Sequence, residues 1–315
     1  MDTDGYYNSY FSVRVAVIPL GSSKGHLDTY VEALMSFKDL LWSDVASLVG
    51  RDSNLAHEVD WKNGLLHFQF RRGAAVDSIT KSLSHIGAWC DTRIIIGVMD
   101  DGVEQDVVRV SREWNAAIEE LSEHDIVHKT ILVFNHDFGI NDEWTIANTM
   151  GKELLSVCPP DGSTDAGTSL LDAHMQETLR MAAAQVFANL QVEFALCAKV
   201  ISAGPKALTQ RLQLTTYHDD LEPVGSLVSF GSSQESALQK RFYKRLGGRL
   251  NKRMGDLCLL VGAAGAAVKF YVQAIQQCKL QGDTVWLVSA QEGLLAALLL
   301  CLLHGPGDHV LASGR

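Results

Sequence analysis

Several features that mark particular protein classes are missing from this 315-residue sequence. It has only 6 prolines, which excludes proline-rich and collagen-like chains. Its 6 cysteines lie at least 20 residues apart and form no CxxC pair, which disfavours zinc ribbons and secreted disulfide scaffolds. The longest apolar run, Leu294 to Leu303, is too short to span a bilayer, so we expect a buried helix there.

Basic residues are also scarce, with 27 Lys and Arg against 37 Asp and Glu and a net charge of -10. An acidic chain lacks the positive field that binds phosphate backbones, so no nucleic-acid partner is expected. The first ten residues include two aspartates and no apolar segment of the kind found in signal peptides. The sequence therefore predicts a folded, cytoplasmic protein.

The first half of the chain alternates strand and helix patterns. Val13, Val15 and Val17 recur at period two before a loop, and residues 26–38 then carry an apolar stripe at helical spacing. Unbroken apolar runs at 92–99 and 129–135 are typical of strands that are buried on both faces. This order predicts an α/β domain with a doubly wound, mostly parallel sheet.

One antiparallel hairpin is predicted within this sheet. The Asn63-Gly64 pair favours a type I′ turn between a strand at Val59 and Trp61 and a second strand from Leu66 onward. A hairpin at this position gives the sheet a G-protein-like strand order.

The second half of the sequence is expected to be helical. A long helical pattern runs to about residue 201, a Ser-, Thr-, Gly- and Asp-rich segment follows, and paired apolar stripes begin near Lys240. The small and aromatic positions of these stripes resemble the tetratricopeptide (TPR) pattern. We therefore expect a flexible N-terminus at 1–12, the α/β domain at 13–205, a linker at 206–237, and the start of an all-α, TPR-like solenoid of helical hairpins at 238–315.

The loop GSSKG at Gly21 to Gly25 follows a strand and precedes a helix, where backbone amides can bind phosphate. It does not match a P-loop, because Lys24 precedes Gly25 and His26 stands where Ser or Thr would bind magnesium. A nucleotide-binding α/β enzyme that uses this loop stays open as an alternative, but an ordinary turn is favoured. No catalytic, cofactor-binding or metal-binding residues are predicted.

A cluster of seven basic residues without an acid is the main charge anomaly of this acidic chain. It is a candidate partner-binding segment, with a solvated helix face as the alternative interpretation. An acidic protein surface is the favoured partner, ahead of an anionic membrane or nucleic acid. The seven residues are Lys240, Arg241, Lys244, Arg245, Arg249, Lys252 and Arg253.

The segment GRLNKRMGDLCLL and the later WLVSAQEGL resemble the large TRAPPII-specific subunit of the TRAPP vesicle-tethering complex, also called the NIK- and IKKβ-binding protein family. VRVAVIPLG and DTRIIIGVMDDG in the N-terminal half resemble the same family more loosely. The motif residues, for which we expect a structural role, are Gly255, Asp256, Leu257, Cys258, Leu259, Trp286, Glu292, Gly293 and Leu294.

This resemblance implies a non-catalytic scaffold subunit of a Golgi-associated exchange factor for Rab-family GTPases, with catalysis in other subunits and no cofactor. The implied partners are other TRAPP subunits, a Rab GTPase indirectly, and a peripheral contact with trans-Golgi or endosomal membranes. Family members are longer, so the chain is expected to be a truncated piece. A generic TPR adaptor is a further alternative, but it needs more repeats than this chain contains.

Overall fold

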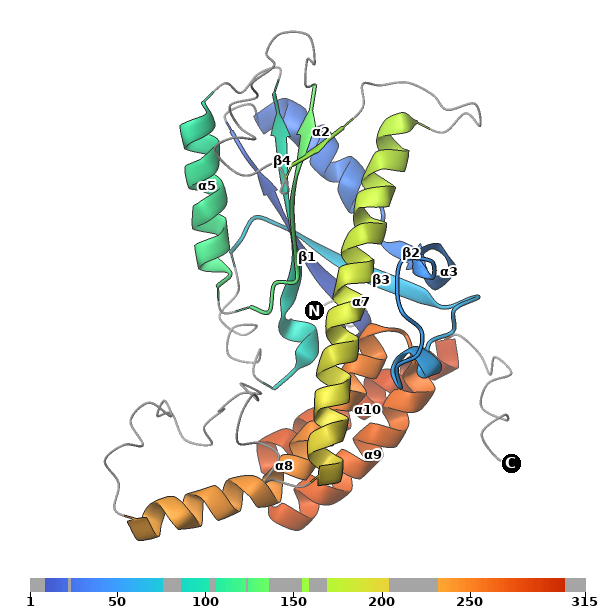
Figure 1. Cartoon of the computed structure of the whole chain (residues 1–315), viewed down its shortest axis with the longest axis vertical. Helices are drawn as coiled ribbons and strands as arrows, with labels where there is room; N and C mark the ends of the chain where they lie inside the picture. The colour runs from blue at the N-terminus through green and yellow to red at the C-terminus, as the bar shows by residue number, and fades with distance from the viewer. Residues whose placement is uncertain are drawn as a thin grey trace.

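The computed structural model describes residues 9–21, 24–75, 86–101, 106–122, 124–135, 155–158, 169–203 and 232–303. Six strands form one sheet in the order β2-β3-β1-β4-β5-β6 (Figure 1). Among these strands β2 alone runs antiparallel to its neighbour, so the mostly parallel α/β sheet is confirmed. The strands are β1 (Ser12–Pro19), β2 (Asp39–Leu41), β3 (Leu65–Arg72), β4 (Thr92–Asp100), β5 (His128–Phe134) and β6 (Leu155–Val157).

Helices cover both faces of the sheet (Figure 1). α2 (Lys24–Met35) and α7 (Leu170–Ala203) pack on one face, and α5 (Val107–Glu120) packs on the other. Successive residues of β1 alternate between the two layers, so that Val15 joins the first core and Ala16 the second. The connections contain the short helices η1 (Ser9–Phe11), α3 (Trp42–Val45), η2 (Ala56–Glu58) and η3 (Ala88–Cys90).

The hairpin predicted across Asn63-Gly64 is wrong. β3 does have an antiparallel neighbour, but that neighbour is β2 and not the segment 59–61. The Asp60 carboxylate accepts hydrogen bonds from the amides of Lys62 and Asn63, each at 3.1 Å, and closes a local turn. Such bonds from a side chain to the backbone compete with strand pairing, which explains why this segment is not extended.

Three long helices end the described chain: α8 (Ser232–Leu260), α9 (Ala264–Gln281) and α10 (Thr284–Leu303). They lie together beyond one end of the sheet (Figure 1). Gly262 and Gly282 have φ of 75° and 62°, and this left-handed backbone reverses the chain between α8 and α9 and between α9 and α10, respectively. The predicted helices are present, although a TPR-like solenoid is not confirmed.

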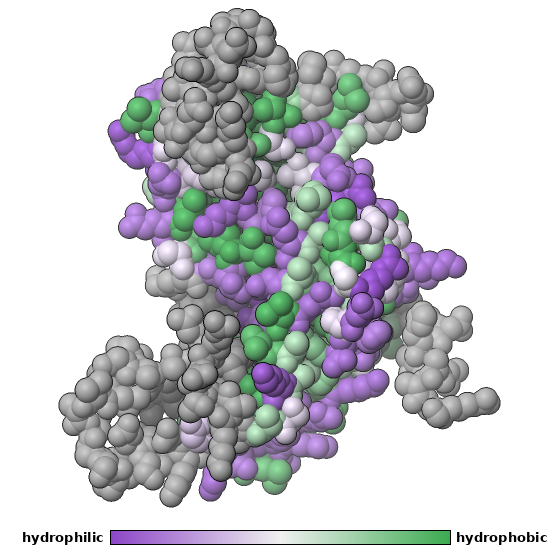
Figure 2. All heavy atoms as spheres, in the orientation of Figure 1, coloured by the Kyte–Doolittle hydropathy of each residue, from purple (hydrophilic) through white to green (hydrophobic). Residues whose placement is uncertain are grey.

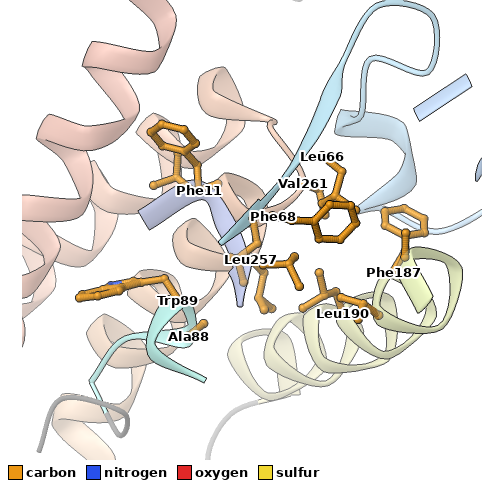
Figure 3. Packing of buried hydrophobic residues seen from close by; sticks show 14 of the residues in the cluster. Phe11, Leu66, Phe68, Ala88, Trp89, Phe187, Leu190, Leu257 and Val261 are labelled. Atoms are coloured by element: carbon orange, nitrogen blue, oxygen red, sulfur yellow. The ribbon is translucent and has the colours of Figure 1, made fainter. Parts of the chain in front are cut away.

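The three helices share one core with the sheet. In Figure 3, Leu257 of α8 lies in the same cluster as Phe68 of β3 and Leu190 of α7. The buried side chains on this side of the sheet form a single continuous cluster that extends into α9 and α10. α8 also contacts α7, η1 and η3 directly. The helices are therefore anchored on the α/β layer.

Some predicted segments fall partly outside the described residues. α8 begins at Ser232, within the last six residues of the linker predicted at 206–237, and residues 206–231 lie outside the description. Within the N-terminus predicted to be flexible, Tyr10 of η1 is fully buried. The spacing of Val76, Ile79, Leu83 and Ile86 also predicts a short helix, and this segment lies outside the described residues up to position 85.

α7 and α10 are long and apolar enough to cross a membrane when only length and composition are considered. The core helix of a soluble protein meets the same test. α7 packs its buried side against the sheet. Figure 2 shows that hydrophobic side chains along its outer side are interrupted by hydrophilic ones. Packing on the sheet therefore accounts for the apolar character of α7.

Candidate interaction site

Tyr271 of α9 is fully buried between two glycines that belong to the neighbouring helices. A Cβ atom on Gly255 of α8 would lie 2.9 Å from the phenol ring, and one on Gly293 of α10 would lie 2.5 Å from it. Both distances are shorter than packed carbon atoms tolerate. The three helices can approach this closely only because these two motif positions have no side chain.

Asp256 of α8 connects α9 and the loop before β4 through its two carboxylate oxygens. Oδ1 accepts a 2.7 Å hydrogen bond from the Tyr271 hydroxyl, while Oδ2 accepts from the Lys252 ammonium at 2.7 Å and from the Ala88 amide at 3.0 Å. Lys252 and Asp256 are both 0% exposed. A buried ion pair is maintained only when its other hydrogen-bonding groups are satisfied, and Lys252 meets this condition by also donating to the Ile86 carbonyl.

The pKa shifts of the residues around Asp256 indicate a structural role for this cluster and not a catalytic one. Burial raises the pKa of the Tyr271 hydroxyl well above its usual value, and Asp256 raises it further, so the phenol stays a donor. Burial also raises the pKa of the Cys258 thiol well above its usual value. Reactive cysteines need the opposite shift. The GDLCL motif therefore holds helices together.

Arg249 makes a second connection, from α8 to the start of α10. Its Nε and Nη2 atoms donate to the two carboxylate oxygens of Asp283, at 2.7 and 3.3 Å, in a bidentate pair. The same guanidinium lies 5.2 Å from the centre of the Trp286 ring, within reach of a cation–π contact. The motif residue Trp286 thus helps to fix α10 against α8.

A third connection joins α8 to α7 and β4 through alternating charges. Arg253 donates through Nε to Glu193 of α7, and its Nη2 lies 3.6 Å from Asp91. Arg93 of β4 is 1% exposed and lies 3.5 Å from the other oxygen of Glu193. Burial alone would raise the pKa of Glu193, but Arg253 and Arg93 together hold it below its usual value. Glu193 is therefore ionised at neutral pH.

The basic segment does not form one exposed surface. Arg245, Arg249 and Lys252 are buried, and the side chain of Arg253 is only 17% exposed. Arg245 is 8% exposed and donates to the Gly282 carbonyl at 3.4 Å. Each of these four residues has a partner that is distant in the sequence, although Lys252 also pairs with Asp256 on its own helix. Only Arg241 and Lys244 are exposed among the six whose side chains are described, and the side chain of Lys240 lies outside the description.

A cavity of about 390 Å³ lies between η3 and the first half of α10. The motif residue Glu292 lies at its edge and accepts a 3.1 Å hydrogen bond from the hydroxyl of Tyr10. Sequence reasoning missed Tyr10, since a lone tyrosine in a short N-terminal segment has no pattern that marks a contact. The cavity is lined by Ile86, Gly87, Trp89, Thr284, Val285, Val288, Ser289 and Glu292.

The loop after β1 is held by an acid. The Gly21 amide donates to the Glu113 carboxylate of α5 at 2.8 Å, and Arg109 holds the other oxygen of that carboxylate at 2.9 Å. In a phosphate-binding loop, backbone amides of this kind donate hydrogen bonds to the ligand. Here a carboxylate takes that place and adds a negative charge that opposes a nucleotide phosphate.

Comparison with known proteins finds one family and several relatives. The N-terminal domain of Trs120/TRAPPC9 matches residues 163–305. The TRAPPII-specific subunit 120 homologue of Arabidopsis thaliana is 24% identical over 308 residues, which is 95% of this chain and 23% of the relative. The resemblance to the large TRAPPII-specific subunit is confirmed. Trafficking protein particle complex subunit 9 of Xenopus laevis is 38% identical over 68 residues, which is 22% of this chain and 6% of the relative.

The matched region contains the α7, α8, α9 and α10 residues of the three connections described above, whereas Ala88, Asp91 and Arg93 lie before it. Residues 163–305 include the described parts of α7, α8, α9 and α10, and with them Asp256, Tyr271 and both glycines that flank the ring. Leu257, Cys258 and Leu259 are buried in the same core, whereas Leu294 is half-buried. The chain spans about a quarter of the length of its Arabidopsis relative. The chain is therefore an α/β layer with a helical layer fixed on it, and the helical layer lies mostly within the region that matches the Trs120/TRAPPC9 N-terminal domain.

Proposed function

We propose that this chain serves as a non-catalytic scaffold subunit of a TRAPPII-type vesicle-tethering complex, which acts as an exchange factor for Rab-family GTPases. The match of residues 163–305 to the Trs120/TRAPPC9 N-terminal domain carries the proposal. The names of the relatives assign them to the trafficking protein particle complex, and we extend that membership to this chain.

The described chemistry supports a scaffold role. Arg249 with Asp283 and Lys252 with Asp256 form buried ion pairs, and the Gly21 amide donates to Glu113. In this proposal nucleotide exchange is catalysed by other subunits, and the chain holds no cofactor. Neither alternative, a nucleotide enzyme using the loop at 21–25 or a generic TPR adaptor, is favoured by the relatives.

The proposed partners are other TRAPP subunits, and a Rab GTPase is reached only through them. The chain would be cytoplasmic and peripheral at trans-Golgi and endosomal membranes. Nucleic acid is not proposed as a partner, because the net charge of -10 opposes phosphate binding. Within the basic segment, the exposed Arg241 and Lys244 are the residues proposed to meet an acidic partner surface.

Affinity purification of the tagged 315-residue chain from its own cells, followed by mass spectrometry, tests the proposal. We expect TRAPP core subunits to be recovered together at moderate salt. Recovery of none of them by a chain with a normal circular dichroism spectrum would contradict scaffold assembly by this region.

A matched pair of variants tests the basic segment within the same experiment. Arg241→Glu with Lys244→Glu is expected to reduce the recovery of partner subunits several-fold, because each change reverses a charge at the proposed contact. Lys199→Glu with Lys279→Glu changes the net charge equally at exposed positions of α7 and α9 and is the control. Equal recovery with both double variants would remove the basic segment from the proposal.

A further inference from the structure

The outward side of α10 carries a row of apolar side chains around a single charge. Glu292 is the one charged residue in the 20-residue helix. The exposed apolar residues are spaced by three, four or seven positions, which places them on the same side as Glu292. They are Val285 (60% exposed), Val288 (49%), Leu295 (45%), Leu298 (44%) and Leu302 (77%), and Leu303 at the end of the helix is also exposed (76%).

The cavity beside η3 extends this apolar face at its N-terminal end. Val285 and Val288 form one wall of the cavity, while Ile86 and Trp89 form the other. Its volume of about 390 Å³ admits a large apolar side chain. Glu292 lies at its edge, where the hydrogen bond from Tyr10 holds the carboxylate in place. The outward side of α10 therefore combines an apolar cavity with a negative charge whose position is fixed by a hydrogen bond.

The charge pattern argues against a lipid surface as the occupant. Helices that lie on membranes carry Lys and Arg beside their apolar face, and anionic headgroups repel carboxylates. α10 contains no basic residue, and Glu292 lies in the middle of its apolar row. Extended exposed apolar surface marks an interaction site, and the Glu292 carboxylate favours a protein partner, which can supply a paired cation, over an anionic headgroup surface.

We propose that the outward face of α10 and the adjoining cavity bind an amphipathic helix of a protein partner. This helix places a large apolar side chain between Trp89 and Val288, and a Lys or Arg beside Glu292. Anchors spaced along one helix face are the usual means by which a helix occupies an apolar groove. A basic residue is required because a carboxylate that loses its water on docking must be paired. This inference rests on the scaffold function proposed above.

The test is fluorescence anisotropy with the purified 315-residue chain and two labelled synthetic helical peptides. Both peptides carry Leu at i, i+3, i+4 and i+7, and they differ only by one Lys or Glu next to this row. The Lys peptide is expected to bind about tenfold more tightly than the Glu peptide, and Glu292→Lys is expected to reverse that order. Val288→Asp should weaken both peptides, whereas Val272→Asp, at a 40% exposed position on α9, should change neither.

Three results would overturn the proposal. The first is equal binding, or no binding, of the two peptides. The second is cosedimentation with phosphatidylserine vesicles that Val288→Asp abolishes, which would assign the face to a membrane. The third is a dimer in sedimentation velocity that Val288→Asp dissociates, which would assign it to a second copy. Because no TRAPP subunit is present, failure here is distinguishable from failure of the scaffold proposal.

Discussion

The Tyr271 hydroxyl of α9 donates a 2.7 Å hydrogen bond to Asp256 of α8 at a site where both side chains are 0% exposed. The ring of the same tyrosine fills the space left by Gly255 and Gly293. One side chain therefore acts both as the spacer between three helices and as a donor to the carboxylate that reaches η3, just before β4. Two motif segments that are distant in the sequence meet at this residue.

Removal of the Tyr271 hydroxyl should destabilise the fold without changing its shape. Tyr271→Phe leaves a buried carboxylate oxygen of Asp256 without its donor, which costs about 1–3 kcal/mol. Urea unfolding followed by circular dichroism should show a lower midpoint with an unchanged slope. Tyr243→Phe, at a half-buried position on α8, is the control. An unchanged midpoint for Tyr271→Phe would show that this hydrogen bond contributes no net stability.

A single methyl group at Gly293 should be harmful although it favours a helix. Gly→Ala in an exposed helix gains up to about 1 kcal/mol, but here the new Cβ would lie 2.5 Å from the Tyr271 ring. Overpacking of this kind costs about 1–3 kcal/mol, so we expect net destabilisation in the same urea assay. Gly265→Ala, on α9, should be neutral or stabilising, because an added Cβ at this position would have no neighbouring atom within 4 Å. Equal effects of the two substitutions would contradict the close packing.

The parallel core of the sheet could be predicted because its signal is local. The side chains of β1 alternate between the two cores, and β4 and β5 each contain a continuous apolar run, so each pattern lies within a few residues. The prediction for the edge strand is wrong because the Asp60 side chain accepts hydrogen bonds from the two backbone amides that follow it closely. These bonds outweigh the Asn63-Gly64 turn signal, and the neighbour of β3 is β2 instead. Residues with strong turn chemistry can favour more than one local structure.

The role of the basic segment could not be predicted from its own residues. Seven basic residues without a neighbouring acid are typical of a surface, but Arg249 pairs with Asp283, and Arg253 pairs with Glu193 and Asp91. These acids are supplied by other elements of the fold. A count of charge along the chain therefore overestimates the exposed charge wherever a helix is buried on several sides.

The connection between Glu193 and its two arginines should make stability depend on pH. The pKa of Glu193 is lower in the folded protein than its ordinary value of 4.5, so its contribution is complete above about pH 4.5 and is lost as the pH falls through the folded-state pKa. Glu193→Gln should cost about 1–3 kcal/mol at pH 7, and the difference from the unsubstituted chain should shrink below pH 4.5. Glu120→Gln, exposed on α5, is the control. A difference that is independent of pH would contradict this assignment.

The loop at 21–25 should not bind nucleotide. The Glu113 carboxylate accepts the hydrogen bond of the Gly21 amide and is held by Arg109, so a phosphate at this amide would have to displace an anion that is already bound. Isothermal titration of the purified chain with GTP or ATP, each with Mg²⁺, is expected to give no heat beyond dilution. Because a silent titration can also reflect a small binding enthalpy, thermal unfolding with the same ligands is the second readout, and no shift in Tm is expected. Saturable heat at one nucleotide per chain, with a higher Tm, would restore the enzyme alternative.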